Sequence, residues 1–453
     1  MKQLLTHLIR SKGWASLVRR AWAIVCRTGF TVHQMRRSLV GFADLLARYD
    51  ARATFPVTAV ALHRHPTVFR RLLARAPMVE LAIHGHRHTD LSLLSEAEQA
   101  AEIEQAAALF RANGIPFAGF RAPYLRWNGS LMATLEAAGL WYDSSQCILW
   151  PVLDEATLDS TQRESVQLLC DFCQPLPAET TPALPFWLND MLEIPVSLPD
   201  DEMLVERLRL RDEEQMATIW SAVLEQCHAR GELFVLQLHP ERFPLCAEAV
   251  DSLLSRAQGL RPPVWLTSLG GVTAWWREKR ALHLDLVPLG EGLWEVIAEG
   301  PERGALLVRG AEVESESVPW NGRTAVRGYG RTAVRPYALV SQRRFKLRAD
   351  VCPCVGVSPA ASLELVQFLA DQGYLLEVSD RTDGHTVYID RGGDRGGSFA
   401  RSEKLPLLAE IEAAPGPLVR WARWPEGAGS ALAVTGDVDA LTVWDYLSRP
   451  FEG

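Results

Sequence analysis

Several apolar runs in this sequence end in residues that can bind a metal ion or move a proton. His84-Gly85-His86-Arg87-His88 follows directly on the run VELAI, and imidazoles four positions apart can face one ion when the loop turns helically. Arg121, Asp143 and His239 follow three other apolar stretches, FAGF, WY and LFVLQL. Taken alone, the histidine cluster could equally be a polar surface turn. Together, these residues predict a hydrolytic metal site.

Such a site also needs carboxylates to serve as metal ligand and general base. The first 52 residues contain only two acids, Asp44 and Asp50, and both fall at helix positions. Asp437 and Asp439 instead follow the apolar run 431–434 near the other end of the sequence. Val438 between them places both carboxylates on one side if the strand stays extended. We therefore expect residues 431–436 to be a strand that delivers the missing acids.

The elements that would position these residues alternate between apolar strands and helices from residue 50 to 282, as in a parallel sheet covered by helices. Ser95 and Glu98 form a capping box that opens one helix, which should end near Gly114. Residues 151–190 look irregular and Pro-rich. Seven strands are expected, at 53–59, 79–84, 117–123, 141–145, 192–197, 233–239 and 264–269. Because this is one short of a (β/α)₈ barrel, we expect 431–436 to insert beside 53–59 as the eighth strand.

Residues 283–430 have a different character, with short antiparallel strands, Gly-rich turns and a helix within SPAASLELVQFLADQG. The predicted domains are therefore a barrel at 1–282, an accessory α+β domain at 283–430, and a returning strand and helix at 431–453. A near-duplicate octad, RTAVRGYG followed by RTAVRPYA, lies at 323–338, and 393–404 reads as an exposed loop. The octad's Arg and Tyr side chains could grip an anionic glycan, but a duplicated loop is the simpler interpretation.

Composition narrows the class of protein. The 453 residues are 48% hydrophobic and 23% charged, with no apolar run long enough to cross a membrane and no secretory h-region. This predicts a cytoplasmic protein, and a net charge of −8 argues against nucleic acid as the partner. Residues 1–48 carry nine basic side chains against Asp44 alone, which fits either a solvated helix face or peripheral contact with an anionic membrane. Cys170-x-x-Cys173 and Cys352-Pro-Cys354 could pair in a zinc site, although the second spacing is tight.

The combined motifs resemble the polysaccharide deacetylase family, the NodB-homology domains of carbohydrate esterase family 4. His84 and His88 match its His-Ser/Thr-x-x-His loop, Arg121-Ala122-Pro123-Tyr124 its Arg-x-Pro-Tyr motif, and Asp143-Ser144-Ser145 its Asp-x-Ser segment. His239 fits the Leu-x-His motif loosely. The resemblance covers residues 30–282 and 431–445 and implies a distorted (β/α) barrel.

The sequence departs from the family pattern at three positions. Gly85 stands where the loop has Ser or Thr, Gly436 where the first motif has Phe, and Val438 separates acids that are usually adjacent. The first motif also lies at the opposite end of the chain from its usual place. We interpret this as a circular permutation of the barrel.

Carried over to this chain, the resemblance implies a divalent metal, zinc in the first instance, bound by His84, His88 and Asp439. Asp437 would be the general base, oriented by Arg121. The backbone N–H of Tyr124 would stabilise the oxyanion. His239 would protonate the leaving amine, tuned by Asp143. The intervening Val438 leaves open which aspartate takes which role.

The predicted function is a metal-dependent deacetylase that removes an N-acyl group, N-acetyl in the first instance, from a sugar or glycan precursor. A cytoplasmic location favours a lipid- or nucleotide-linked substrate, and the basic N-terminal region would suit a lipid-linked one. The alternative from another class is a non-catalytic glycan-binding protein with a degenerate barrel, which is favoured if Asp437 and Asp439 lie far from His84. A third interpretation has the strand at 431–436 completing a neighbouring subunit's barrel in an oligomer.

Overall fold

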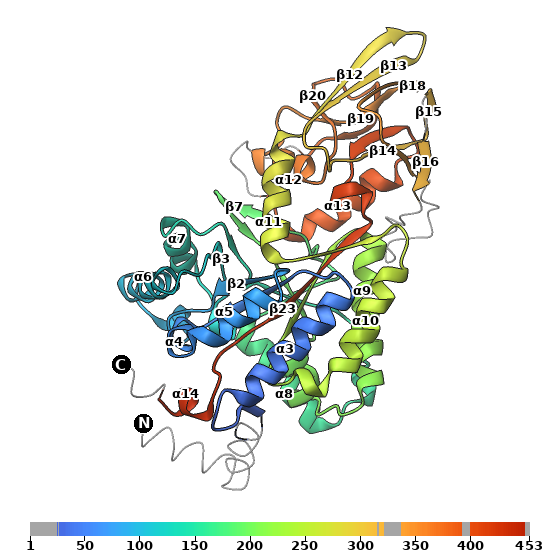
Figure 1. Ribbon diagram of the computed structural model, residues 1–453. Coiled ribbons are helices and arrows are strands. Elements are labelled where there is room, and N and C mark those ends of the chain that lie inside the picture. The colour runs from blue at the N-terminus through green and yellow to red at the C-terminus, as the bar shows by residue number, and fades with distance from the viewer. Residues whose placement is uncertain (1–24, 26, 315–316, 321–336, 392–398, 449–453) are drawn as a thin grey trace.

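Strands from both halves of the chain meet in one twelve-stranded sheet in the lower part of Figure 1, and three smaller sheets form the upper part. The computed structural model describes residues 25, 27–314, 317–320, 337–391 and 399–448. The architecture is mixed α/β, as expected, with a curled and largely parallel sheet.

The strands of the large sheet run parallel to their neighbours except where β7 pairs with β8. Their order is β6-β5-β9-β10-β23-β1-β2-β3-β4-β8-β7, and β11 pairs with β23 beside this path. The strands are β1 (Ala53–Val57), β2 (Val79–Ile83), β3 (Gly119–Phe120), β4 (Tyr142–Asp143), β5 (Cys147–Leu149), β6 (Leu176–Pro177), β7 (Phe186–Leu188), β8 (Met191–Glu193), β9 (Val196–Leu198), β10 (Leu233–Leu238), β11 (Val264–Thr267) and β23 (Ser430–Gly436).

The strand β23 lies between β10 and β1 in the same chain. It pairs with β10 from Ala431 to Gly436, and with β1 at Val434 and Thr435. Its first four residues pair with β11. All seven residues are buried, which explains the continuous apolar run, because a parallel strand covered on both faces has no solvent-facing side. The expected pairing of 431–436 beside 53–59 is therefore present.

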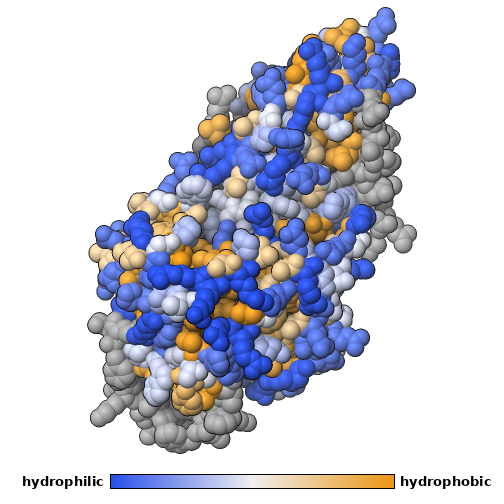
Figure 2. Space-filling view, in the orientation of Figure 1, coloured by the Kyte–Doolittle hydropathy of each residue, from blue (hydrophilic) through white to orange (hydrophobic). Residues whose placement is uncertain are grey.

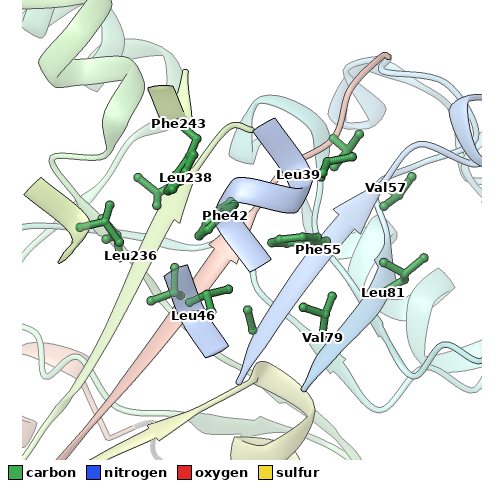
Figure 3. Packing of buried hydrophobic residues seen from close by; sticks show 14 of the residues in the cluster. Leu39, Phe42, Leu46, Phe55, Val57, Val79, Leu81, Leu236, Leu238 and Phe243 are labelled. Atoms are coloured by element: carbon green, nitrogen blue, oxygen red, sulfur yellow. The ribbon is translucent and has the colours of Figure 1, made fainter. Parts of the chain in front are cut away.

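Gly436 makes room for aromatic rings that cover β23. A Cβ atom at this position would lie 2.6 Å from Cε1 of Phe55 and 3.0 Å from Cε1 of Phe42. Phe42 comes from α3 (His33–Arg48), which crosses over β23, and its ring stacks on that of Phe243 at 4.7 Å between centroids (Figure 3). The resembled motif has Phe where this chain has Gly436. The rings of Phe55 on β1 and Phe42 on α3 fill the space beside this glycine.

Helices cover the outside of the large sheet (Figure 1). Besides α3, they are α4 (Ala59–Arg64), α5 (Pro66–Arg75), α6 (Glu96–Ala112), α7 (Gly129–Ala137), α8 (Ser160–Cys173), α9 (Glu213–Arg230), α10 (Ala247–Gly259) and α11 (Leu269–Glu278). The predicted capping box at the start of α6 is confirmed, with Ser95 and Glu98 bonding each other's backbone N–H groups. The helix ends at Ala112, and Gly114 follows with a φ of +67°.

The segment 151–190 is more regular than its sequence suggested. It contains α8, which opens on a second capping box formed by Asp159 and Gln162, and it also contributes β6 and β7. The expectation of an irregular insertion was wrong because the prolines fall on either side of the helix and none lies within it. This helix matters below, since four of its residues, Leu168, Leu169, Phe172 and Cys173, line the candidate site.

The upper part is built from residues after α11, beginning at β12 (His283–Gly290). Two of its sheets are antiparallel, and the third, with order β20-β19-β21, is parallel. The helices are α12 (Leu363–Asp371) and α13 (Arg401–Ala413). The other strands are β13 (Leu293–Glu299), β14 (Leu306–Arg309), β15 (Glu312–Glu314), β16 (Ser317–Trp320), β17 (Tyr337–Val340), β18 (Arg344–Arg348), β19 (Cys352–Val357), β20 (Leu376–Val378), β21 (His385–Ile389) and β22 (Leu418–Trp421).

Two expectations from the sequence fall partly or wholly outside the described residues. Most of the RTAVR octad pair lies there, and so do residues 1–24 of the basic segment at 1–48. The predicted loop at 393–404 is only partly described, and its last four residues belong to α13. Of the helices that are described, none combines the length and hydropathy needed to cross a membrane. Figure 2 shows hydrophilic residues over most of the visible face, with hydrophobic ones in small groups.

Replacing Gly436 by Ala should destabilise the protein by about 1–3 kcal/mol, the usual cost of overpacking a core, because the new methyl would press on Phe55. Urea unfolding followed by circular dichroism measures this. Gly259→Ala is the matched control, since a Cβ there meets nothing within 4 Å and Gly259 is exposed. Equal unfolding midpoints for the two variants would contradict the tight packing described for Gly436.

Candidate active site

The carboxyl ends of β2, β3, β9, β10 and β23 converge on one cavity of about 590 Å³. Parallel strands end on the same edge of a sheet, so residues that follow them are brought together however far apart they lie in sequence. Six of the eight site residues predicted from the sequence line this cavity: His84, His88, Tyr124, His239, Asp437 and Asp439. Arg121 and Asp143 are fully buried beside it.

His84, His88 and Asp439 form a three-residue cluster. The Nε2 atom of His84 lies 3.4 Å from Oδ1 of Asp439, and the Nε2 atom of His88 lies 3.3 Å from Oδ2 of the same carboxylate. One ligand atom from each of the three residues falls within 4.8 Å of the others. Two imidazoles and a carboxylate are a ligand set that zinc and other divalent metals accept.

The tautomer of His84 is fixed by its second nitrogen. Nδ1 lies 2.8 Å from the backbone carbonyl oxygen of Arg121, so that nitrogen donates the hydrogen bond and Nε2 keeps its lone pair toward Asp439. Carbonyl groups commonly hold metal-binding histidines in this way. The residues present therefore fit a divalent metal ion.

Gly85 gives the loop after His84 its direction. It has a φ of +78°, and a Cβ there would lie 2.8 Å from the backbone oxygen of Arg87. Both features disfavour Ser or Thr at this position. The departure at Gly85 is therefore a backbone requirement of this loop, which turns tightly enough to bring His88 back beside His84, with ring centroids 5.2 Å apart.

Asp437 and Asp439 both face the cavity because Val438 faces away from it. The N–H of Val438 donates to the carbonyl of Pro56, and its own carbonyl accepts from Thr58, so the backbone stays paired beside β1 past the end of β23. The Val438 side chain is fully buried in the hydrophobic core. Alternation along an extended chain then puts its two neighbours on the opposite side.

Asp437 is buried and held at both carboxylate oxygens. Nη1 of Arg121 donates to its Oδ1 at 2.8 Å, and Nε2 of Gln237 donates to its Oδ2 at 2.8 Å. The same Oδ2 lies 4.0 Å from Nε2 of His84. Asp437 is thus oriented by two donors next to the histidine pair, whereas Asp439 lies directly at both imidazoles.

Arg121 is fixed on every side of its guanidinium group. Its Nε donates to the backbone carbonyl of Ser144 at 2.9 Å and its Nη2 to the Ser144 hydroxyl at 2.9 Å. Nη1 also donates to the hydroxyl of Thr435 at 2.6 Å. A planar, bonded guanidinium of this kind cannot rotate, so it fixes the direction of the Asp437 carboxylate.

His239 faces the cavity with a buried carboxylate behind it. Its Nδ1 lies 2.7 Å from Oδ1 of Asp201, and its backbone N–H donates to Oδ2 of that residue at 2.6 Å. Burial lowers the pKa of His239, but the charge of Asp201 opposes this, and the net effect raises the pKa to about 10. His239 therefore carries its proton at neutral pH.

The expectation that Asp143 tunes His239 is corrected, because Asp201 occupies that place. Asp143 accepts a hydrogen bond from the Ser145 hydroxyl at 2.8 Å, and this hydroxyl in turn accepts from the backbone N–H of Ala122. Burial and the neighbouring Glu193 raise the pKa of Asp143 well above its usual value. Asp143 thus supports the segment that carries Arg121 and Tyr124.

Tyr124 lies at the cavity rim in an unusual backbone conformation. Its φ is +63° and that of Leu125 is +56°, and two consecutive non-glycine residues in this region carry strain that concentrates at functional sites. The Tyr124 ring meets the His88 ring edge-on at 4.3 Å between centroids. The side chain is 44% exposed, so it is accessible from the cavity mouth.

Sequence reasoning missed Asp201, Gln237 and Thr435. Gln237 and Thr435 are polar residues inside otherwise apolar strands, which was a usable signal of a buried polar partner. Asp201 follows the end of β9 as part of a Pro-Asp-Asp sequence, but nothing local to it indicates His239 as its partner.

Part of the chain is similar to a known protein family. Residues 35–142 match the sequence model of the polysaccharide deacetylases. Among solved structures, a protein from Mycobacterium smegmatis named as a polysaccharide deacetylase is 20% identical, with a TM-score of 0.42 over 62% of this chain and 86% of the other. One of the same name from Pseudomonas aeruginosa PAO1 is 18% identical, with a TM-score of 0.42 over 53% and 72%.

A pseudoenzyme of carbohydrate esterase family 4 from Bacillus anthracis is also similar, at 11% identity and a TM-score of 0.25 over 42% of this chain and 57% of the other. All three TM-scores are too low to carry an argument about function.

Replacing Asp201 by Asn should lower the pKa of His239 from about 10 to its ordinary value of 6.5 or below, because burial would then act without the opposing carboxylate. NMR titration of ¹³C-labelled histidine measures the change. The raised pKa stabilises the wild type fully below pH 6.5, and this contribution is lost as the pH rises toward about 10. The gap in unfolding free energy between wild type and variant should therefore narrow over that range.

Glu241→Gln is the matched control for this titration, since Glu241 is the weakest of the named influences on His239. It should lower the pKa of His239 much less than Asp201→Asn does. A His239 that still titrates near pH 10 in the Asp201→Asn variant would show that other acids hold its proton.

Proposed function

We propose that this chain, whose residues 35–142 match the polysaccharide deacetylase family, is a metal-dependent hydrolase that removes an N-acyl group, N-acetyl in the first instance, from a sugar or glycan. The observation that carries the proposal is that His84, His88 and Asp439 lie together in a cavity that Asp437 and His239 also line. The proposed metal ligands and the proposed acid and base are therefore within one substrate-sized space.

The proposed metal ion is divalent, and zinc suits the two imidazoles and one carboxylate best. Such an ion supplies Lewis-acid polarisation of the acyl carbonyl and lowers the pKa of a water molecule. The position of Asp439 at both imidazoles supports its assignment as the ligand, and leaves Asp437 as the base.

Asp437 would take the proton from the attacking water. Arg121 and Gln237 hold its two oxygens, so the carboxylate is oriented before substrate arrives. As the water oxygen bonds to the acyl carbon, negative charge develops on the acyl oxygen. We assign the backbone N–H of Tyr124 to that charge, on the resemblance of Arg121-Ala122-Pro123-Tyr124 to the family motif and on the place of Tyr124 at the cavity rim.

His239 would complete the reaction as the general acid. The C–N bond breaks and the nitrogen takes the proton of His239, which gives the free amine and releases the acyl group as a carboxylate. A pKa of about 10 keeps this proton in place at neutral pH, and Asp201 holds the ring by Nδ1, so that the other ring nitrogen is left to donate.

The cavity lining supports a carbohydrate rather than a small polar substrate. Tyr124, Leu125, Leu168 and Phe172 provide apolar and aromatic surface, which can stack on sugar rings, and Arg27, Arg207 and Arg242 bring positive charge to the same space. Each arginine is paired with an acid, Arg27 and Arg242 with Glu206 and Arg207 with Glu202. A lipid- or nucleotide-linked substrate is therefore a prediction from the sequence alone. A cytoplasmic location, peripheral membrane contact and an oligomeric state remain predictions from the sequence.

The non-catalytic alternative requires the acids to lie far from the histidines. Here the Asp437 and Asp439 carboxylates lie 4.0 and 3.4 Å from Nε2 of His84, which supports the catalytic proposal. The pairing of β23 inside its own chain likewise supports a barrel completed without a neighbour.

Asp437→Asn should reduce kcat for deacetylation by about 10²–10⁴-fold, the usual contribution of a general base, without loss of metal. Release of acetate from N-acetylated amino-sugar oligomers measures the rate, and elemental analysis measures the metal. Asp44→Asn is the control, because Asp44 is an exposed residue of α3 that pairs with Arg75. Full activity in Asp437→Asn would contradict its role as the base.

Treatment with a chelator should abolish deacetylation, and added divalent metal should restore it. His88→Ala should contain one ion fewer per chain than the wild type, since it removes a ligand of the barrel site, and metal should not rescue its activity. If the metal-loaded wild type binds such oligomers but releases no acetate from any of them, the non-catalytic glycan-binding function is correct instead.

A further inference from the structure

A second group of metal-binding residue types lies in the upper part of the molecule, on the parallel sheet β20-β19-β21. Cys352 and Cys354 are on the central strand β19, Glu377 is on β20 and His385 begins β21. Ligand atoms of Cys352, Cys354 and Glu377 all lie within 4.8 Å of one another. None of these residues belongs to the barrel site.

The two thiols face each other. The Sγ atoms of Cys352 and Cys354 are 3.2 Å apart, in hydrogen-bond contact and well beyond the roughly 2.05 Å of a disulfide bond. Both sulfurs are therefore available as ligands. The spacing with one intervening residue, which was tight for a zinc knuckle, is sufficient here because the other donors come from neighbouring strands.

The strand register brings those donors to the cysteines. Glu377 pairs with Gly356 on one side of β19, and His385 pairs with Cys352 on the other. Gly356 is the reason that His385 can reach across the strand, because a Cβ there would lie 2.7 Å from the imidazole. As a result, Nε2 of His385 lies 3.4 Å from Oε2 of Glu377.

His385 is buried without a conventional role. Its side chain is 3% exposed, and its Nδ1 atom has no hydrogen-bond partner. A buried polar ring with an unsatisfied nitrogen is costly unless the ring serves a ligand or another function. Among the residues that the structure describes, this ring is ion-paired with Glu377, a member of the cysteine cluster.

The surroundings favour a cation. A cavity of about 620 Å³ adjoins the cluster, and its lining includes Asp285, Asp350, Asp383 and Glu377 against one cation, Arg381. Acidic walls raise the local concentration of positive ions. Cys352 is partly exposed and the Glu377 side chain is 52% exposed, so an ion can enter from solvent.

We propose that Cys352, Cys354, Glu377 and His385 form a binding site for a thiophilic divalent metal ion, zinc in the first instance. Cys352, Cys354 and Glu377 already lie together and supply two thiolates and a carboxylate. His385, which contacts Glu377, would supply the imidazole, and four protein ligands are typical of structural rather than catalytic zinc. The ion ties β20 and β21 to β19, and so stabilises the accessory domain. This site is independent of the proposed deacetylase function.

Cobalt(II) distinguishes this site from the barrel site, because thiolate ligands give a near-ultraviolet charge-transfer band that imidazole and carboxylate ligands do not. The full-length protein is purified with reductant, stripped with a chelator and titrated with Co²⁺. We expect about two ions per chain and the thiolate band. Cys352→Ser and Cys354→Ser should each lose the band and one ion, whereas His88→Ala should lose one ion and keep the band.

Cys170→Ser combined with Cys173→Ser is the matched control, since Cys173 lines the barrel cavity, and it should keep the band. If the cysteine variants do not fold, Glu377→Gln is used, because its side chain is half exposed; it should weaken Co²⁺ binding at the thiolate site by about tenfold or more. Zn²⁺ should displace Co²⁺ and raise the melting temperature of the wild type. Absence of the band, its persistence in Cys352→Ser, or a Cys352–Cys354 disulfide that forms while Zn²⁺ is present would each overturn the proposal.

Discussion

The insertion of β23 between β10 and β1 is the interaction on which the rest of the barrel depends. β23 lies inside the sheet rather than at its edge, and it pairs with β10, β1 and β11. Asp437 and Asp439 come directly after this strand. The same strand therefore completes the sheet and brings both acids to the candidate site. Glycine at position 436, beneath Phe42 and Phe55, lets this happen without a gap in the core.

Arg121 connects this strand to the rest of the site. Its carbonyl accepts from His84, and its guanidinium reaches Asp437, Thr435 and Ser144. A charged group that is fully buried must be compensated, and here each compensating contact also orients a residue at the carboxyl end of another strand. The backbone of Arg121 therefore fixes the His84 ring and its side chain fixes the Asp437 carboxylate, although neither residue is its neighbour in sequence.

The sequence predicted the site well where function is tied to a local pattern. His84, His88, Arg121 and His239 each follow an apolar run. Asp437 and Asp439 follow another, whereas the only two acids before residue 53, Asp44 and Asp50, were expected at helix positions. Partners that depend on tertiary proximity could not be predicted in the same way. Asp201 meets His239 only because the end of β9 lies next to the end of β10, and Phe55 replaces the aromatic ring missing at Gly436 only because β1 lies beside β23. The pairing of Cys352 and Cys354 with Glu377 and His385 likewise depends on strand register, not on spacing.

The place of β23 in the chain order has a consequence for synthesis on the ribosome. Every other strand of the barrel emerges before it, and the whole accessory domain emerges between β11 and β23. Until then β1 and β10 have unpaired edges facing each other, which are open to wrong partners. A nascent chain that stops before residue 430 lacks Asp437 and Asp439, so His84 and His88 are without their carboxylate partners. The two halves of the large sheet can therefore pair through β23 only after the accessory domain has been synthesised.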